Sequence, residues 1–148
     1  MAARIKVFLD TSALFSGAWS LTGGAHLILK LGEVHSLDIW LSPQVLSELE
    51  KALQEKAPEL LGDMALLLDR ARVQITRSCP AEQAKLYLPI LSHPGDAQVI
   101  ADAVSAGPDY FVTLDRKHFL ENQDLQGRLP FPLGTPGDFL AWYRERLA

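Results

Sequence analysis

Three aspartates stand where the carboxyl ends of strands, or the first turn of a helix, are expected. Asp10 directly follows the apolar run Val7–Leu9, and Asp115 directly follows the run Phe111–Leu114. Asp96 lies at the start of a predicted helix that leads into the second run. In an open parallel sheet, ligands bind in the crevice beyond the carboxyl ends of the strands, and the helices that lead back into strands begin at this same edge. We therefore expect the three carboxylates to converge.

A glutamate on another predicted helix would supply a fourth carboxylate. Ser42 and Pro43 mark the start of this helix, because serine caps a helix and proline fits its first position. Glu48 flanks one side of the apolar stripe of the helix, and Glu50 flanks the other side. The helical periodicity alone does not choose between the two glutamates.

A cluster of this composition indicates a site for a divalent cation. Neighbouring carboxylates stay ionised at neutral pH only when a positive charge compensates for their repulsion. Ligand sets made only of oxygen suit Mg²⁺ or Mn²⁺ rather than Zn²⁺. A bound ion would lower the pKa of a coordinated water, aim that water at phosphorus and stabilise charge on the departing oxygen. The predicted chemistry is hydrolysis of a phosphodiester.

Other polar residues near the three aspartates have simpler interpretations. Asp102 follows Asp96 by six residues, about 240° around a helix, and is predicted to point away from it. His93 is interpreted as a helix cap or as a partner of the site. The basic residues Arg116 and Lys117, with the histidine that follows them, are either solvated charges or contacts to a substrate phosphate.

Short apolar runs alternate with helical periodicity along the chain. Strands are predicted over residues 5–9, 38–41, 73–76, 110–114 and 131–133. Helices are predicted over residues 25–34, 43–53, 58–71, 80–91, 96–106 and from 136 onward, with a loop or short helical turn over 10–19. Buried strands separated by helices imply a parallel sheet covered on both faces. We predict one domain, residues 1–148, built as a three-layer α/β/α sandwich around a central, mostly parallel sheet.

The bulk properties limit the classes of protein that fit. A chain of 148 residues with 22% charged residues is typical of one globular domain. The net charge of −4 argues against a protein that coats nucleic acid without specificity. The single cysteine, Cys79, fits a reducing compartment. The chain starts without a signal-peptide pattern, and no apolar run approaches the ~20 residues needed to cross a bilayer. We therefore expect a cytoplasmic protein with no membrane partner.

Three segments together resemble the PIN-domain family. They read VFLDTSALFSG, LSPQVLSEL and HPGDAQVIADAVSAGPDYFVTLDRKHF, and they occur in the order of the family's motifs over nearly the whole chain. The third segment is the most specific, because an aspartate and a later alanine are followed by glycine, a strand and Thr-x-Asp-Arg. The first segment alone would be a weak signal. The helical segment 58–71 leaves the subfamily open.

The resemblance assigns the family's acidic positions to residues of this chain. Asp10 matches the first, Asp96 the third and Asp115 the fourth of these positions. Glu48 matches the second, so the resemblance favours it over Glu50. Asp10, Asp96 and Asp115 would be the metal ligands, and all four residues would be catalytic.

The resemblance also assigns supporting roles. Thr113 matches the hydroxyl residue that commonly precedes the last aspartate, and Ser12 stands where the family often has asparagine. Both would support the acidic residues or the substrate, together with Arg116 and Lys117.

The resemblance implies an endoribonuclease that depends on Mg²⁺ or Mn²⁺ and hydrolyses RNA, as VapC-type toxins of toxin–antitoxin pairs do. It implies a homodimer, to which the apolar helix stripe Leu60–Leu68 would contribute, and a cognate antitoxin protein. The alternatives are a non-catalytic PIN-like module that binds RNA or acts as a scaffold, and a phosphotransfer or receiver-type α/β protein. A haloacid-dehalogenase-type enzyme would require a second aspartate two positions after Asp10, where this chain has Ser12.

Overall fold

The strand β1 (Ile5–Leu9) lies at the centre of a five-stranded sheet in the computed structural model, which describes residues 3–147. The other strands are β2 (Leu37–Leu41), β3 (Gln74–Ile75), β4 (Tyr110–Val112) and β5 (Leu133–Gly134). Their order is β3-β2-β1-β4-β5, and every pairing among them is parallel. The order reverses between β1 and β4, so the edge beyond their carboxyl ends is the place where an open α/β sheet binds ligands.

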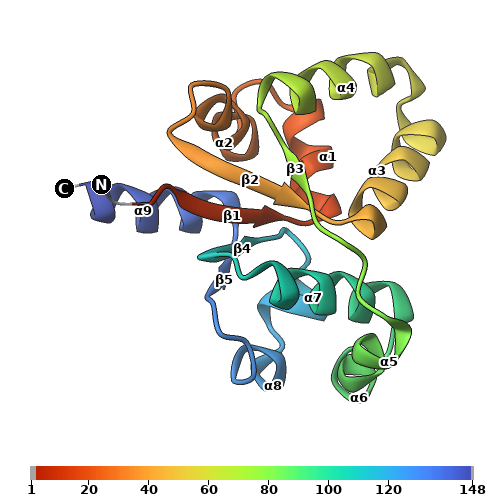
Figure 1. Cartoon of the computed structure of the whole chain (residues 1–148). Coiled ribbons are helices and arrows are strands. Elements are labelled where there is room, and N and C mark those ends of the chain that lie inside the picture. Colours follow the sequence, from red (N-terminus) through yellow and green to blue (C-terminus); the bar gives the residue numbers. More distant parts are fainter. Residues whose placement is uncertain (1–2, 148) are drawn as a thin grey trace.

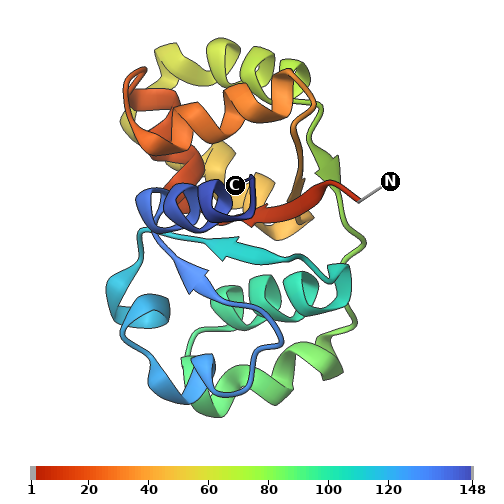
Figure 2. The ribbon, with the colours of Figure 1, turned by 90° about the vertical axis from the view of Figure 1, so that its left-hand side faces the viewer.

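Helices cover both faces of this sheet (Figures 1 and 2). On one side lie α1 (Thr11–Trp19), α2 (Gly24–Glu33), α3 (Pro43–Lys56) and, after the short η1 (Pro58–Leu60), α4 (Leu61–Arg70). On the other side lie α5 (Ala81–Ala84), η2 (Lys85–Tyr87), α6 (Leu88–Leu91), α7 (Pro94–Ala106) and α8 (Gln123–Gln126). The last helix, α9 (Pro136–Leu147), packs against α2. This arrangement confirms the predicted three-layer α/β/α sandwich, with an all-parallel sheet among the described residues.

The two central strands carry the core of the molecule. Val7, Phe8 and Leu9 are almost fully buried, as a strand covered on both faces requires. The rings of Phe8 and Phe111 stack with their centroids 5.3 Å apart, directly across the β1–β4 pairing. This contact holds the two strands in the register that aligns their carboxyl ends.

Several predicted elements differ from the observed ones. Residues 11–19 form the full helix α1 rather than a loop or short turn. The helix predicted over 80–91 is broken into three short pieces, because Pro89 has no N–H with which to continue the preceding turn. The strand β4 ends at Val112 rather than at residue 114. The π-helical turn η3 (Arg116–Leu120) and the short α8 were not predicted.

Within residues 3–147, no helix combines the length and the apolar character that crossing a membrane would require.

Candidate active site

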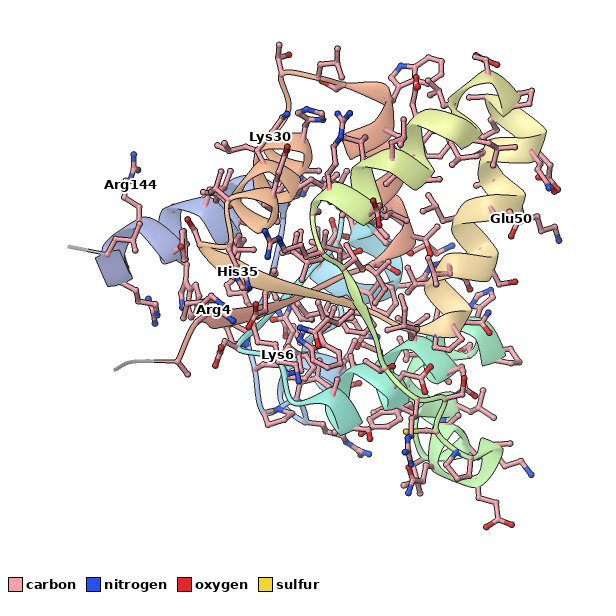
Figure 3. The ribbon with its side chains drawn as sticks, turned by 45° about the horizontal axis from the view of Figure 1, so that its top comes forward. Arg4, Lys6, Lys30, His35, Glu50 and Arg144 are labelled. Carbon is pink, nitrogen blue, oxygen red and sulfur yellow. The ribbon has the colours of Figure 1, made fainter. Side chains whose placement is uncertain are left out.

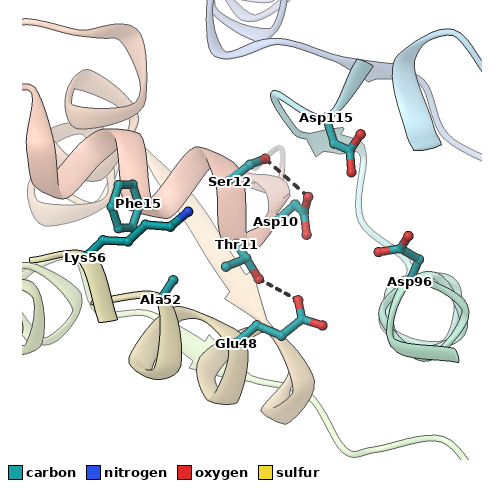
Figure 4. Close-up of a pocket in the computed structure, with 9 residues that line it drawn as sticks. All are labelled: Asp10, Thr11, Ser12, Phe15, Glu48, Ala52, Lys56, Asp96 and Asp115. Carbon is teal, nitrogen blue, oxygen red and sulfur yellow. Dashed lines mark hydrogen bonds between the residues drawn. The ribbon is translucent and has the colours of Figure 1, made fainter. Parts of the chain in front are cut away.

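Four acidic side chains from four separate elements line one pocket at the carboxyl edge of the sheet (Figure 4). Asp10 follows β1, Asp115 follows β4, and Asp96 lies in the first turn of α7. Glu48 comes from α3, whose start is capped by the Ser42 hydroxyl. The structure therefore brings together all four carboxylates that the sequence singled out.

Asp10 stands at the N-cap position of α1, but its side chain makes no capping hydrogen bond there. Its backbone N–H donates instead to Val112 O at 3.0 Å, so the residue extends the β1–β4 pairing by one step. Its carboxylate is directed into the pocket, as Figure 4 shows. The sheet thus fixes the backbone of Asp10 and leaves the side chain available for chemistry.

Two hydroxyl groups connect Asp10 to the segment that carries Asp115. The buried Thr113 hydroxyl donates to Asp10 Oδ2 at 2.8 Å, and the Ser12 hydroxyl lies 3.3 Å from the same oxygen. In the other direction, Leu114 N donates to Ser12 Oγ at 2.9 Å, and Asp115 N donates to Thr113 Oγ1 at 3.0 Å. Ser12 and Thr113 therefore bridge the two strand ends.

Glu48 is oriented by partners of its own. The Thr11 hydroxyl donates to Glu48 Oε1 at 2.9 Å, and Gln44 Nε2 donates to Glu48 Oε2 at 2.9 Å. A side chain at Gly95 would place its Cβ only 3.0 Å from Glu48 Oε2, so glycine there lets the start of α7 come close to α3. Glu50, by contrast, is exposed and lies outside this pocket, beside the groove between α3 and α4 (Figure 3).

The electrostatics of the pocket favour added positive charge. The pKa of Asp10 is raised to about 6, chiefly by burial; hydrogen bonds from Thr113 and Thr11 lower it, and the nearby Glu48 and Asp96 raise it. The pKa of Asp96 is also raised, first by burial and then by Asp115 and Glu48, while His118 and His93 lower it. Each of these carboxylates is harder to ionise in the fold than in water, as expected for a like-charged cluster.

The donor set of the pocket fits a hard divalent cation. Asp10, Glu48, Asp96 and Asp115 offer carboxylate oxygens from several directions, which is the ligand chemistry of Mg²⁺ and Mn²⁺. A cation among them would offset the repulsion that raises the pKa values of Asp10 and Asp96.

Some candidate residues of the sequence lie elsewhere. Arg116 and Lys117 are exposed and do not line the pocket. Asp102 is fully buried away from it, where Asp102 Oδ1 accepts hydrogen bonds from Cys79 N and Gln98 Nε2. His93 occupies the N-cap position of α7, as predicted, although its side chain makes no capping hydrogen bond.

Other residues of the pocket were not predicted from the sequence. Phe15, Ala52 and Lys56 line the pocket, and Lys56 extends from the end of α3 past the Phe15 ring toward the carboxylates (Figure 4). A signal for Lys56 was present, because it follows Glu48 by eight residues and so lies on a neighbouring face of the same helix. His118 was expected as a phosphate contact at most, yet its Nδ1 lies 2.9 Å from Asp115 Oδ2.

Solved structures show which known proteins share this fold. The sequence matches no family profile and no curated protein. Similar folds are found in VapBC from Salmonella typhimurium bound to DNA, at a TM-score of 0.63 and 16% identity over 89% of this chain and 98% of the other. VapBC2 from Rickettsia felis, bound to a promoter DNA fragment, gives a TM-score of 0.61 and 18% identity over 87% and 97% of the two chains.

A third similar structure carries a stated activity. VapC20 from Mycobacterium tuberculosis, described as a toxin that cleaves the sarcin–ricin loop, gives a TM-score of 0.57 and 17% identity over 78% of this chain and 94% of the other. At these identities the likeness is one of fold. The chain has the VapC-like PIN-domain fold that the sequence motifs predicted.

The raised pKa of Asp10 predicts how stability depends on pH in the absence of metal. Because the folded pKa of about 6 lies above the ordinary 3.8, the folded chain binds this proton more tightly than the unfolded chain. Stability is therefore lost as the pH rises between about 4 and about 6. The side chain of Asp10→Asn does not titrate in this range. In EDTA, the free energy of unfolding of Asp10→Asn relative to that of the wild type should therefore rise by up to about 2–3 kcal/mol between about pH 4 and about pH 8.

Thermal melting of both proteins at the two pH values measures this difference, with Glu50→Gln on the exposed face of α3 as the control. A melting-temperature difference between Asp10→Asn and wild type that is the same at both pH values would contradict the prediction.

Proposed function

We propose that this chain is a metal-dependent endoribonuclease that hydrolyses RNA phosphodiesters. The observation that carries the proposal is the convergence of Asp10, Glu48, Asp96 and Asp115 on one pocket at the switch point of a VapC-like fold. Asp10, Asp96 and Asp115 would hold Mg²⁺ or Mn²⁺, with Glu48 as the fourth catalytic carboxylate. RNA is the preferred substrate because the sequence motifs resemble a family that contains ribonucleases, and because VapC20, which has a similar fold, is described as a toxin that cleaves the sarcin–ricin loop.

When bound, the divalent ion supplies an activated water and stabilises charge on the leaving oxygen. The residues of the chain would orient the metal ligands and accept a proton. Thr113 and Ser12 hold Asp10 in one orientation through their hydroxyl groups. Glu48, oriented by Thr11 and Gln44, is placed to accept a proton from the attacking water.

The acidic pocket also requires a means of attracting a polyanion. Lys56 is the basic residue among those that line the pocket, and we propose that it contacts a substrate phosphate. Its ammonium group lies 5.7 Å from the centroid of the Phe15 ring, which keeps the side chain over the pocket wall. Arg116 and Lys117 are exposed beside Asp115 and would contact phosphates farther along the same strand of RNA.

The proposed mechanism predicts that cleavage depends on a divalent metal. The purified protein should cleave single-stranded RNA with Mg²⁺ or Mn²⁺ and stop when EDTA is added. Asp115→Asn removes a proposed ligand, so its rate should fall by more than the roughly 10–100-fold that loss of an outer partner of a metal ligand costs. Divalent metal should raise the melting temperature of the wild type more than that of Asp115→Asn, because a ligand that binds only the folded state stabilises it.

Glu50→Gln is the matched control for this experiment, since Glu50 lies on α3 outside the acidic pocket. It should keep both its activity and its metal-induced stabilisation. Undiminished cleavage in EDTA would refute the metal mechanism. Binding of RNA without cleavage in any divalent metal would favour the non-catalytic alternative.

The proposed phosphate contact of Lys56 is tested by substitution. Lys56→Gln should raise KM several-fold with little change in kcat, and it should lower the dependence of log KM on log salt by roughly one unit, because one phosphate contact is lost. Lys51→Gln is the control, since Lys51 is exposed on the same helix but does not line the pocket. Equal effects of the two substitutions would indicate a general charge effect and contradict a specific contact.

Two protein partners are proposed, a cognate antitoxin and a second copy of this chain. The VapBC structures of similar fold support a cognate antitoxin, which a short reading frame adjoining this gene would encode and which should copurify.

A homodimer is also proposed, but the apolar side chains of α4 that were first considered for its interface point mostly inward. Met64 is buried and Leu67 and Leu68 pack against the core, so Leu66 is the clearly exposed leucine of α4, at 54%.

The apolar surface between α2 and α9 is the better candidate for the dimer contact. It is lined by Leu27, Leu31, Leu140 and Leu147, and Leu27 and Leu147 are 50% and 69% exposed. Light scattering at tens of micromolar should therefore give twice the mass of one chain. Leu27→Lys should halve this mass, and Leu66→Lys, the control on α4, should not. A wild-type protein of single-chain mass would rule out the homodimer.

A further inference from the structure

Two histidines lie against one side of the acidic pocket. His118 Nδ1 is 3.6 Å from Asp96 Oδ2, and His93 Nδ1 is 4.0 Å from the same oxygen. One ligand atom from each of His93, Asp96 and His118 can be chosen so that all three lie within 4.8 Å of one another. The four-carboxylate mechanism proposed above does not use either imidazole.

The local fold directs both rings to this place. His93 is held between α6 and α7, where His93 Nδ1 lies 3.3 Å from Leu91 O. His118 sits on the π-helical turn η3, which begins with the hydrogen bond from Leu120 N to Asp115 O at 3.0 Å. π-Helical turns are rare in proteins overall, but those that occur often lie at functional sites. The two rings meet edge to face with their centroids 4.7 Å apart.

We propose that His93, Asp96 and His118 form a second cation site, selective for a borderline divalent ion of the Zn²⁺ or Co²⁺ type. Imidazole nitrogen suits these ions, whereas Mg²⁺ prefers oxygen ligands. Tetrahedral coordination at about 2.0–2.1 Å from nitrogen implies ligand atoms roughly 3.3 Å apart. The observed distances of 3.6 and 4.0 Å, and the third distance within 4.8 Å, would have to contract. The exposed His93 side chain can make this movement by giving up its contact with Leu91 O.

Three protein ligands leave a fourth tetrahedral position, as in zinc sites that also bind water or substrate. Asp115 Oδ2 is near enough to compete for that position, since it lies 2.9 Å from His118 Nδ1. The site would therefore draw on Asp96, which lines the acidic pocket, and on His118, which contacts Asp115. An ion bound here would withdraw Asp96 from the Mg²⁺ or Mn²⁺ site, so it would inhibit cleavage; this consequence rests on the proposed nuclease function, whereas the binding itself does not.

The binding test uses Co²⁺ as a probe, read by its visible absorption on the metal-free full chain. One equivalent of Co²⁺ should bind. His93→Asn and His118→Asn should each weaken binding by at least about tenfold. Asp10→Asn should bind as the wild type does, because Asp10 is not among the three ligands.

His35→Asn is the matched histidine control. His35 lies beside Asp38, and Figure 3 shows it near Arg4 and Lys6 at the amino end of the strands. His93→Asn carries the test, because its exposed side chain can be replaced without disturbing the core, and circular dichroism checks the fold of His118→Asn. Wild-type Co²⁺ binding by both histidine variants, or loss of binding in Asp10→Asn alone, would overturn the proposal.

Inhibition is read separately. Zn²⁺ should inhibit Mg²⁺-dependent cleavage by the wild type, and His93→Asn should cleave normally but resist Zn²⁺. A wild type that binds Co²⁺ through the histidines but cleaves no RNA would refute the nuclease proposal and leave the cation site standing. A wild type that cleaves RNA but shows no histidine-dependent Co²⁺ binding would refute only the cation site.

Discussion

The carboxylate of Asp10 is buried at the end of the central strand, and the site around it depends on how that buried charge is stabilised. Burial of an ionised carboxylate is unfavourable unless it is hydrogen-bonded or paired with a positive charge. Only 6% of Asp10 is exposed, and its carboxylate accepts hydrogen bonds from the Thr113 and Ser12 hydroxyl groups, which carry no charge. The pKa of Asp10 is raised to about 6 as a result. The partial satisfaction of this group leaves it suited to bind a cation.

This constraint explains why the pairing of β1 with β4 matters for the site. The Thr113 hydroxyl can reach Asp10 because the two strands run side by side in parallel and in register, Leu9 opposite Val112. The stacked rings of Phe8 and Phe111 stabilise that register from the core. A shift of one residue would turn every side chain of the strand to the opposite face and would remove both contacts. The geometry of the acidic pocket is therefore coupled directly to core packing.

Asp96 occupies a boundary between two kinds of ligand chemistry. Toward Asp10 and Glu48 it faces carboxylate oxygens, and toward η3 it faces imidazole nitrogens. The raised pKa of Asp96 reflects this position, because burial and two carboxylates oppose its ionisation while two histidines favour it. Asp96 can thus belong to a site for a hard cation and to a site for a borderline cation. The identity of the bound ion would decide whether Asp96 binds it together with carboxylates or together with histidines.

Local sequence patterns were sufficient to place Asp10 and Asp115 after strands and Asp96 at the start of a helix, because strand ends and helix caps depend on residues adjacent in the chain. The alternation of short apolar runs with helical periodicity also predicted the α/β/α fold. Periodicity could not choose between Glu48 and Glu50, because both flank the same apolar stripe; the packing of α3 against α1 and α7 turned Glu48 toward the pocket and left Glu50 in solvent. The contacts of His118 with Asp96 and Asp115 required the π-helical turn, which no short-range pattern indicated. The Thr113–Asp10 hydrogen bond joins residues 103 positions apart, so it depends on the strand order, which only the tertiary structure decided.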